Sequence, residues 1–170
     1  MTSILKVTEI QDPTNGNTAL TIDTTGRILT PARPAFAADK NGNFSTTSTA
    51  AKVTVWTENF DTGGCWDNAN SKFVAPVAGL YQFNYSGLHH SGVSGTGNYV
   101  GARIVLNGTE NILDLLGDQG TYGVYQRVSG TVAWELSADD YIEIWARSAN
   151  TSGFVYGSSS YTVFSGYLVG

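Results

Sequence analysis

Apolar and polar residues alternate with a period of two through much of the chain. The clearest alternating segments are residues 100–106, 131–136 and 141–147. Successive side chains of a strand point to opposite faces, so each segment predicts a strand with one buried face. The residues expected to face inward are Val100, Ala102, Ile104, Leu106, Val132, Trp134, Leu136, Ile142, Ile144 and Ala146.

Turn-forming residues separate these segments, at 107–108, 117–118, 138–140 and 150–153. The best candidate for a helix, residues 111–116, is too short and lacks capping residues. Short strands with turn signals about every 8–12 residues are typical of a β-sandwich or barrel. The pattern therefore predicts an all-β protein.

The first 30 residues follow a separate, weaker pattern. Two short alternating stretches, one with Leu5 and Val7 and one with Leu20 and Ile22, flank a turn at residues 12–17. A further turn at residues 25–26 precedes another short apolar pair. An isolated hairpin of this size is marginally stable in water. We therefore expect these four apolar residues to dock the segment on another surface by strand addition.

Two prolines mark the end of this segment. Pro31 and Pro34 resist continuation of a strand ladder, as do the residues before them. The sequence thus predicts a hairpin-like docking segment over residues 1–30 and a main domain over residues 31–170.

Composition and charge exclude several classes of function. The 170 residues have a net charge of −5, and the nine Lys and Arg residues form no basic patch, so nucleic-acid binding is not expected. No apolar run approaches the ~20 residues of a membrane helix, which excludes membrane insertion by such a helix. The N-terminus lacks the apolar stretch of a signal peptide, so synthesis in a cytoplasm without export is expected. The single cysteine excludes a disulfide framework within the chain.

From Pro34 onward, four segments resemble in order the C1q-like domain, which belongs with the tumour-necrosis-factor-like jelly rolls. They are residues 34–38, 73–83 with the sequence FVAPVAGLYQF, 129–132, and the closing stretch 161–170. The resemblance rests on an aromatic residue, a proline, a Gly-x-Tyr-x-Phe motif, and an alternating last strand. The matching positions are Phe73, Pro76, Gly79, Tyr81, Phe83, Phe164, Gly166 and Leu168.

This resemblance implies a jelly-roll β-sandwich with a short N-terminal β appendage, assembled as a homotrimer. Tyr141 and Trp145 alternate with inward-facing residues, and a monomer would leave such aromatic residues as exposed patches. Closed threefold symmetry would bury them, so they are our candidates for the trimer interface.

Residues 16–29 resemble lead-in segments of bacteriophage virion proteins. Together with the domain, this implies a structural protein of a phage particle: a fibre, tip, or capsid or tail decoration protein. Its partners would be other virion proteins, reached through residues 1–30, and a glycan of the host surface. The alternative is a cellular C1q-like carbohydrate-binding lectin or adhesin, which a signal peptide would favour.

Catalytic motifs are not found, so we expect no enzyme and no cofactor. Ser94 misses the last glycine of a nucleophile elbow, and the glycine-rich residues 95–101 enter a strand, not a helix. His89 and His90 are adjacent on a strand and point to opposite faces, so they do not easily share a metal. Cys65 is interpreted as a loop thiol. A jelly-roll hydrolase or isomerase would need a histidine cluster or acid pair inside the barrel.

Calcium is a separate question. Some members of the C1q-like family, which this sequence resembles, bind calcium near the trimer apex through two acidic residues. Here Asp118 matches the first acid, whereas Gln126 stands at the second position. Calcium affinity rises with the number of carboxylates. We therefore expect no calcium requirement, with Asp118 as the one weak metal candidate.

Overall fold

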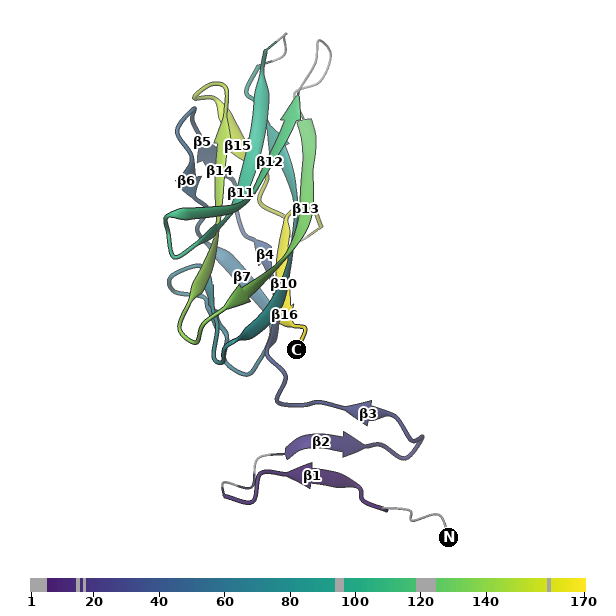
Figure 1. Ribbon diagram of the computed structural model, residues 1–170. Helices are drawn as coiled ribbons and strands as arrows, with labels where there is room; N and C mark the ends of the chain where they lie inside the picture. The colour runs from purple at the N-terminus through teal and green to yellow at the C-terminus, as the bar shows by residue number, and fades with distance from the viewer. Residues whose placement is uncertain (1–5, 15, 17, 94–96, 119–124, 159) are drawn as a thin grey trace.

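The computed structural model is an all-β structure in which every strand pairing is antiparallel (Figure 1). It describes residues 6–14, 16, 18–93, 97–118, 125–158 and 160–170. Within these residues the strands form three sheets, two of which face each other as a sandwich. The third is a small sheet at the N-terminus. The predicted all-β jelly-roll architecture is confirmed.

The sheet around β10 (Gly79–His90) forms one layer of the sandwich. Its order is β5 (Phe44–Thr46), β15 (Gly153–Val155), β10, β16 (Val163–Leu168), β4 (Ala35–Lys40) and β7 (Trp56–Thr62), and β13 (Tyr125–Leu136) also pairs with β10. Side chains along β10 alternate between buried and half-buried, as the period of two requires. We call this layer the β10 sheet.

The sheet around β14 (Tyr141–Ser148) forms the other layer. Its order is β12 (Glu110–Asp118), β11 (Tyr99–Leu106), β14, β9 (Lys72–Val74) and β8 (Trp66–Asp67), and β6 (Ala51–Lys52) also pairs with β14. The predicted turn at residues 107–108 is confirmed, since Asn107 and Gly108 both have positive φ, as a tight hairpin requires. The turn predicted at residues 117–118 is wrong, because β12 continues through both in register with β11.

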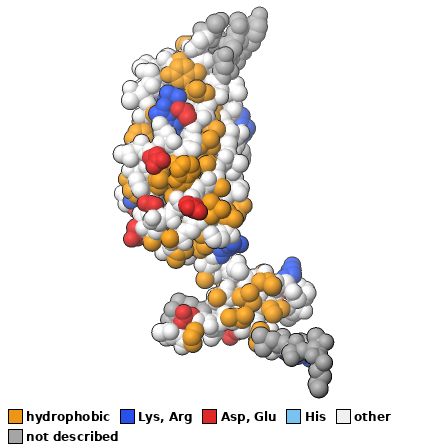
Figure 2. Space-filling model, viewed as in Figure 1, with side chains coloured by type: hydrophobic (Ala, Val, Ile, Leu, Met, Phe, Trp, Pro, Cys, Tyr) orange, Lys and Arg blue, Asp and Glu red, His pale blue; other side chains and the backbone are white. Residues whose placement is uncertain are grey.

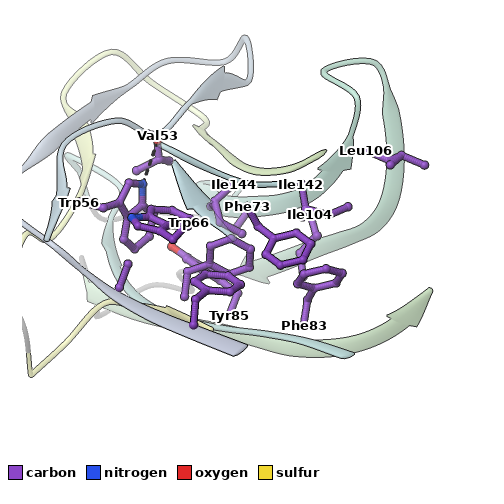
Figure 3. Packing of buried hydrophobic residues seen from close by; sticks show 14 of the residues in the cluster. Val53, Trp56, Trp66, Phe73, Phe83, Tyr85, Ile104, Leu106, Ile142 and Ile144 are labelled. Carbon is purple, nitrogen blue, oxygen red and sulfur yellow. Dashed lines mark hydrogen bonds between the residues drawn. The ribbon is translucent and has the colours of Figure 1, made fainter. Parts of the chain in front are cut away.

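Aromatic rings fill the space between the two sheets (Figure 3). Phe36 stacks on Trp66 with centroids 5.0 Å apart and meets Phe164 edge-on, also at 5.0 Å. Phe73 lies edge-on to Phe83 at 5.1 Å. Such pairs contribute about 0.5–1.5 kcal/mol each beyond their buried area. The core is therefore held by aromatic residues drawn from both layers.

The predicted inward residues are buried with two exceptions, both on β13. Val132 is only partly buried, and Trp134 keeps 36% of its surface exposed. Their register is as expected, since Val132 pairs with Phe83 and Trp134 with Tyr81. Among the described strands β13 pairs only with β10, so its free edge is less covered than the centre of the sheet. Position at an edge, which alternation does not encode, accounts for the difference.

The N-terminal segment forms a three-stranded sheet, where the sequence suggested a hairpin. Its strands are β1 (Glu9–Gln11), β2 (Thr18–Ile22) and β3 (Ile28–Leu29). The first strand begins after Val7, so the alternation of Leu5 and Val7 did not mark it. Figure 1 places this sheet below the sandwich, at the end where the C-terminus lies. The Arg33 guanidinium donates to the Val169 carbonyl at the junction.

Candidate functional site

The glycine–aromatic motif of the sequence is a packing site between β10 and β16. Gly166 pairs with Phe83, and a Cβ atom on Gly166 would lie 2.6 Å from the Phe83 ring. At Gly79 a Cβ atom would lie 2.8 Å from Leu168 Cδ1. Both glycines therefore make room for neighbouring side chains.

The remaining motif residues also serve packing. Tyr81, Phe83, Phe73 and Phe164 are buried in the core, whereas Pro76 is exposed in the loop before β10. The Tyr81 hydroxyl donates to the Val77 carbonyl at 2.8 Å, which holds that loop against the strand. The motif thus builds the sandwich and presents no reactive group to a ligand.

One face of the N-terminal sheet is apolar and uncovered. Ile10 pairs with Leu20, and Ile22 with Ile28, so these four side chains share a face. Ile10 is 49% and Ile28 66% exposed. Figure 2 shows apolar side chains gathered on this small sheet. We call Ile10, Leu20, Ile22 and Ile28 the apolar docking face.

The docking residues expected from the sequence belong to this face only in part. Leu20 and Ile22 lie on it, Val7 precedes β1 and is half-buried, and Leu5 lies outside the described residues. Ile10 and Ile28 were missed because they stand in strands of three and two residues. Strands this short contain no alternation to detect.

Tyr141 and Trp145, the interface candidates, point away from the sandwich and are partly covered within one protomer. The Lys72 ammonium lies 4.3 Å from the centre of the Tyr141 ring. The Trp145 indole donates to Glu143 Oε2 at 2.9 Å, and Glu143 is itself bridged to Lys52 at 2.7 Å. Their role in assembly stays a prediction.

A second group of aromatic residues lies on the outer face of the β10 sheet. His90 stacks on Phe154 at 4.6 Å and meets Tyr125 edge-on at 4.7 Å, while Tyr156 and Tyr161 pack at 5.3 Å. We call these five residues the aromatic end. A cavity of about 210 Å³ lies between Leu88, Tyr125, Tyr156 and Tyr161. The alternating-strand argument missed this surface because most of its residues lie in short strands and connections.

The two histidines point to opposite faces, as predicted from their adjacency. His89 is buried and shares a hydrogen bond with the Tyr85 hydroxyl at 2.8 Å, whereas His90 belongs to the outer aromatic end. Burial lowers the pKa of His89 to about 4 and also lowers that of His90. Each ring is used in packing, and the pair does not converge on one point.

Cys65 lies in the loop between β7 and β8, as interpreted from the sequence, and it is buried there. Its thiol donates to Asp61 Oδ1 at 3.2 Å. Burial, together with the Asp61 carboxylate, raises the pKa of this thiol to about 12. The group is therefore protonated and unreactive at neutral pH.

The described residues contain no cluster of three or more His, Cys, Asp or Glu side chains that would hold a metal ion. Asp118 ends β12, and its side chain lies outside the part of the chain that the structure describes. Gln126 is half-buried and donates to the Arg127 carbonyl at 3.4 Å. The same part of the chain holds no helix long and apolar enough to cross a membrane.

Comparison with known proteins agrees with this geometry. The family described as the C1q domain matches residues 35–169. This chain belongs to the C1q domain family. The C1q domain found here begins at β4 and ends just after β16, and no curated protein sequence matches the chain.

Solved structures share the fold of this C1q domain. The globular domain of zebrafish complement 1qA is similar with a TM-score of 0.58 and 17% identity, covering 81% of this chain and 98% of its own. Murine APRIL gives 0.62 and 14%, covering 81% and 99%. Eiger TNF from S. frugiperda gives 0.65 and 10%, covering 82% and 94%. At these identities the likeness concerns the fold alone.

Proposed function

We propose that this chain is a non-enzymatic, homotrimeric structural protein of a phage particle, acting as a fibre, tip, or capsid or tail decoration protein. It is made in the host cytoplasm and becomes part of the virion. Residues 1–30 attach it to other virion proteins, and the C1q domain faces outward toward the host surface. C1q and TNF-like domains are generally non-catalytic and trimeric, which supports the first part of the proposal.

The observation that carries the proposal is the apolar docking face. Its four side chains lie on a sheet of three short strands, which is too small to bury them within itself. Ile28 is two-thirds exposed. It lies in β3, beside which a strand of another protein would extend the sheet. The C1q domain has a separate aromatic core and does not need this face.

Deletion of residues 1–30 tests the attachment. We expect the truncated chain to remain a soluble, folded trimer that no longer incorporates into particles. Ile28→Lys should weaken incorporation in the full chain, while Thr24→Lys, which adds the same charge at an exposed turn position, serves as the matched control. Copy number per particle is measured by quantitative mass spectrometry. Loading of the truncated chain at the wild-type copy number would refute the docking role.

The alternative function is that of a cellular C1q-like lectin or adhesin. The aromatic end would support it, because aromatic rings beside an open cavity suit the apolar face of a sugar. The two functions differ in whether the N-terminal sheet is required. A lectin would retain full ligand binding without residues 1–30 and would have no particle to join.

A further inference from the structure

On the outer face of the β14 sheet, two side chains close over one glycine. Gly101 of β11 pairs with Leu116 on β12 and Arg147 on β14. A Cβ atom on Gly101 would lie 3.1 Å from Leu116 Cδ2 and 3.4 Å from Arg147 Nε. A larger residue would therefore press against the Leu115 carbonyl oxygen, 3.0 Å from the Cβ position, and would displace Leu116 and Arg147.

A cavity of about 460 Å³ is lined by Gly97, Asn98, Tyr99, Leu116, Gly117 and Arg147. Leu116 is 64% exposed, although it is a large apolar side chain in a strand. The Tyr99 ring centre lies 5.7 Å from the Arg147 guanidinium carbon. The cavity thus offers an aromatic ring, an aliphatic side chain and a cation around one open space, as ligand sites do.

The charges beside the cavity do not balance. Asp114 accepts from Arg103 Nε at 3.0 Å and from Arg147 Nη2 at 3.0 Å, so one carboxylate faces two guanidinium groups. The nearby Glu143 is paired with Lys52. Figure 2 shows basic side chains gathered around an acidic one on this side of the domain. One positive charge is left without a partner in the described residues.

Arg147 also has an unused donor. Its guanidinium donates to Asp114 through Nη2, and its Nε is buried without a hydrogen-bond partner among the described residues. An unpaired buried donor is unfavourable, so a ligand oxygen that reaches it would be held more strongly. The guanidinium is a cationic hydrogen-bond donor, which matches a carboxylate acceptor.

We propose that this cavity binds a carboxylate-bearing sugar, a uronic acid residue of a surface polysaccharide. Arg147 would bind the carboxylate, Tyr99 and Leu116 would contact the apolar face of the sugar ring, and Asn98 would meet its hydroxyls. A single excess positive charge among the described side chains suits one carboxylate, whereas the net charge of −5 opposes a dense polyanion. All of these residues belong to one protomer.

Titration calorimetry with the full chain tests the site, using tetragalacturonate and its carboxyl-reduced, neutral counterpart as probes. We expect the acidic tetrasaccharide to bind and the neutral one to bind about tenfold more weakly or not at all. Arg147→Gln should remove that preference. Arg27→Gln is the matched control, since it also releases a surface arginine from an aspartate, Asp23, at a distant place.

Gly101→Ala provides a second variant that would displace Leu116 and Arg147 without changing charge, and it should weaken binding of the acidic probe by at least about fivefold. Circular dichroism melting establishes that each variant is folded. The proposal is overturned if the acidic probe does not bind at millimolar concentration, if both tetrasaccharides bind equally, or if Arg147→Gln and Arg27→Gln have the same effect. Equal binding of dextran sulfate, with the same dependence on Arg147, would also overturn it in favour of a general anion site.

Discussion

At the residue scale, two buried ionisable groups make contributions to stability that the sequence does not reveal. Lys40 ends β4 with its ammonium buried, where it donates to the carbonyls of Asn41, Gly42 and Val55 at 2.6, 2.7 and 3.1 Å. Burial lowers the pKa of Lys40 to about 8, which still leaves it mostly charged at pH 7. The side chain thus closes the turn between β4 and β5.

We expect Lys40→Met to lower the free energy of unfolding by about 1–3 kcal/mol, because three carbonyls lose their donor. Urea denaturation of the two proteins at pH 7 measures the change. Lys72→Met is the matched control, since its ammonium lies over the Tyr141 ring on the surface and should contribute under about 1 kcal/mol. Equal losses for both variants would show that the hydrogen bonds from Lys40 to the three carbonyls add no stability.

His89 gives the protein a pH dependence with a definite sign. Its pKa is lowered to about 4 by burial, below the 6.5 of an exposed histidine, so the unfolded chain takes up the proton first as pH falls. Stability is therefore full above pH 6.5 and is lost toward pH 4. Between pH 6.5 and 4.5 we expect the wild type to lose about 2–3 kcal/mol more than His89→Gln.

Denaturant titrations at several pH values provide this comparison. His90→Gln serves as the control, because His90 lies on the outer face and is only partly buried. If wild type and His89→Gln lost stability in parallel, titration of His89 would not contribute.

At the scale of the elements, the contact between β10 and β16 decides how closely the central strands pack. Gly166→Val would drive its side chain into Phe83, whose ring lies 2.6 Å from the Cβ position. We expect a loss of about 1–3 kcal/mol from this overpacking. Ser165→Val, one residue earlier and facing outward, is the control, with an effect within about 0.5 kcal/mol. Thermal melts of both variants measure the difference.

At the scale of the whole molecule, we predict a trimer. Light scattering at micromolar concentration should give three times 18.1 kDa, and a stable 18.1 kDa species would contradict the prediction. Two surfaces are candidates for the trimer interface: the one that contains Tyr141 and Trp145, and the aromatic end. Trp145→Ser tests the first and Tyr161→Ser the aromatic end, and the variant that shifts the protein toward monomer identifies the buried aromatic residue.

Calcium is predicted to be dispensable for assembly. Gln126 offers an amide where relatives that bind calcium have an acid, and one carboxylate is a weak ligand set. Treatment with EDTA should leave the melting temperature and the trimer unchanged. A fall of more than a few degrees that added calcium restores would show that a calcium site exists.

The amino-acid sequence by itself determined the all-β class, because its information is local and periodic, and its resemblance to the C1q-like domain implied the jelly roll. Alternation marked the strands around Ile104 and Ile144, and turn residues such as Asn107 and Gly108 marked a hairpin, since both follow from backbone geometry at neighbouring positions. The motif around Phe83 and Gly166 indicated the family for the same reason. These features can be recognised without knowledge of any contact between residues that are far apart in the sequence.

Only the tertiary structure decided which side chains meet on the surface of the protein. Arg103, Asp114 and Arg147 come from three strands, and no spacing along the chain places two guanidinium groups on one carboxylate. Leu116 and Arg147 can close over Gly101 because strand pairing sets them on either side of a residue without a side chain. Burial of Cys65 and exposure of Trp134 likewise depend on what packs against them, which is a property of the assembled sheets.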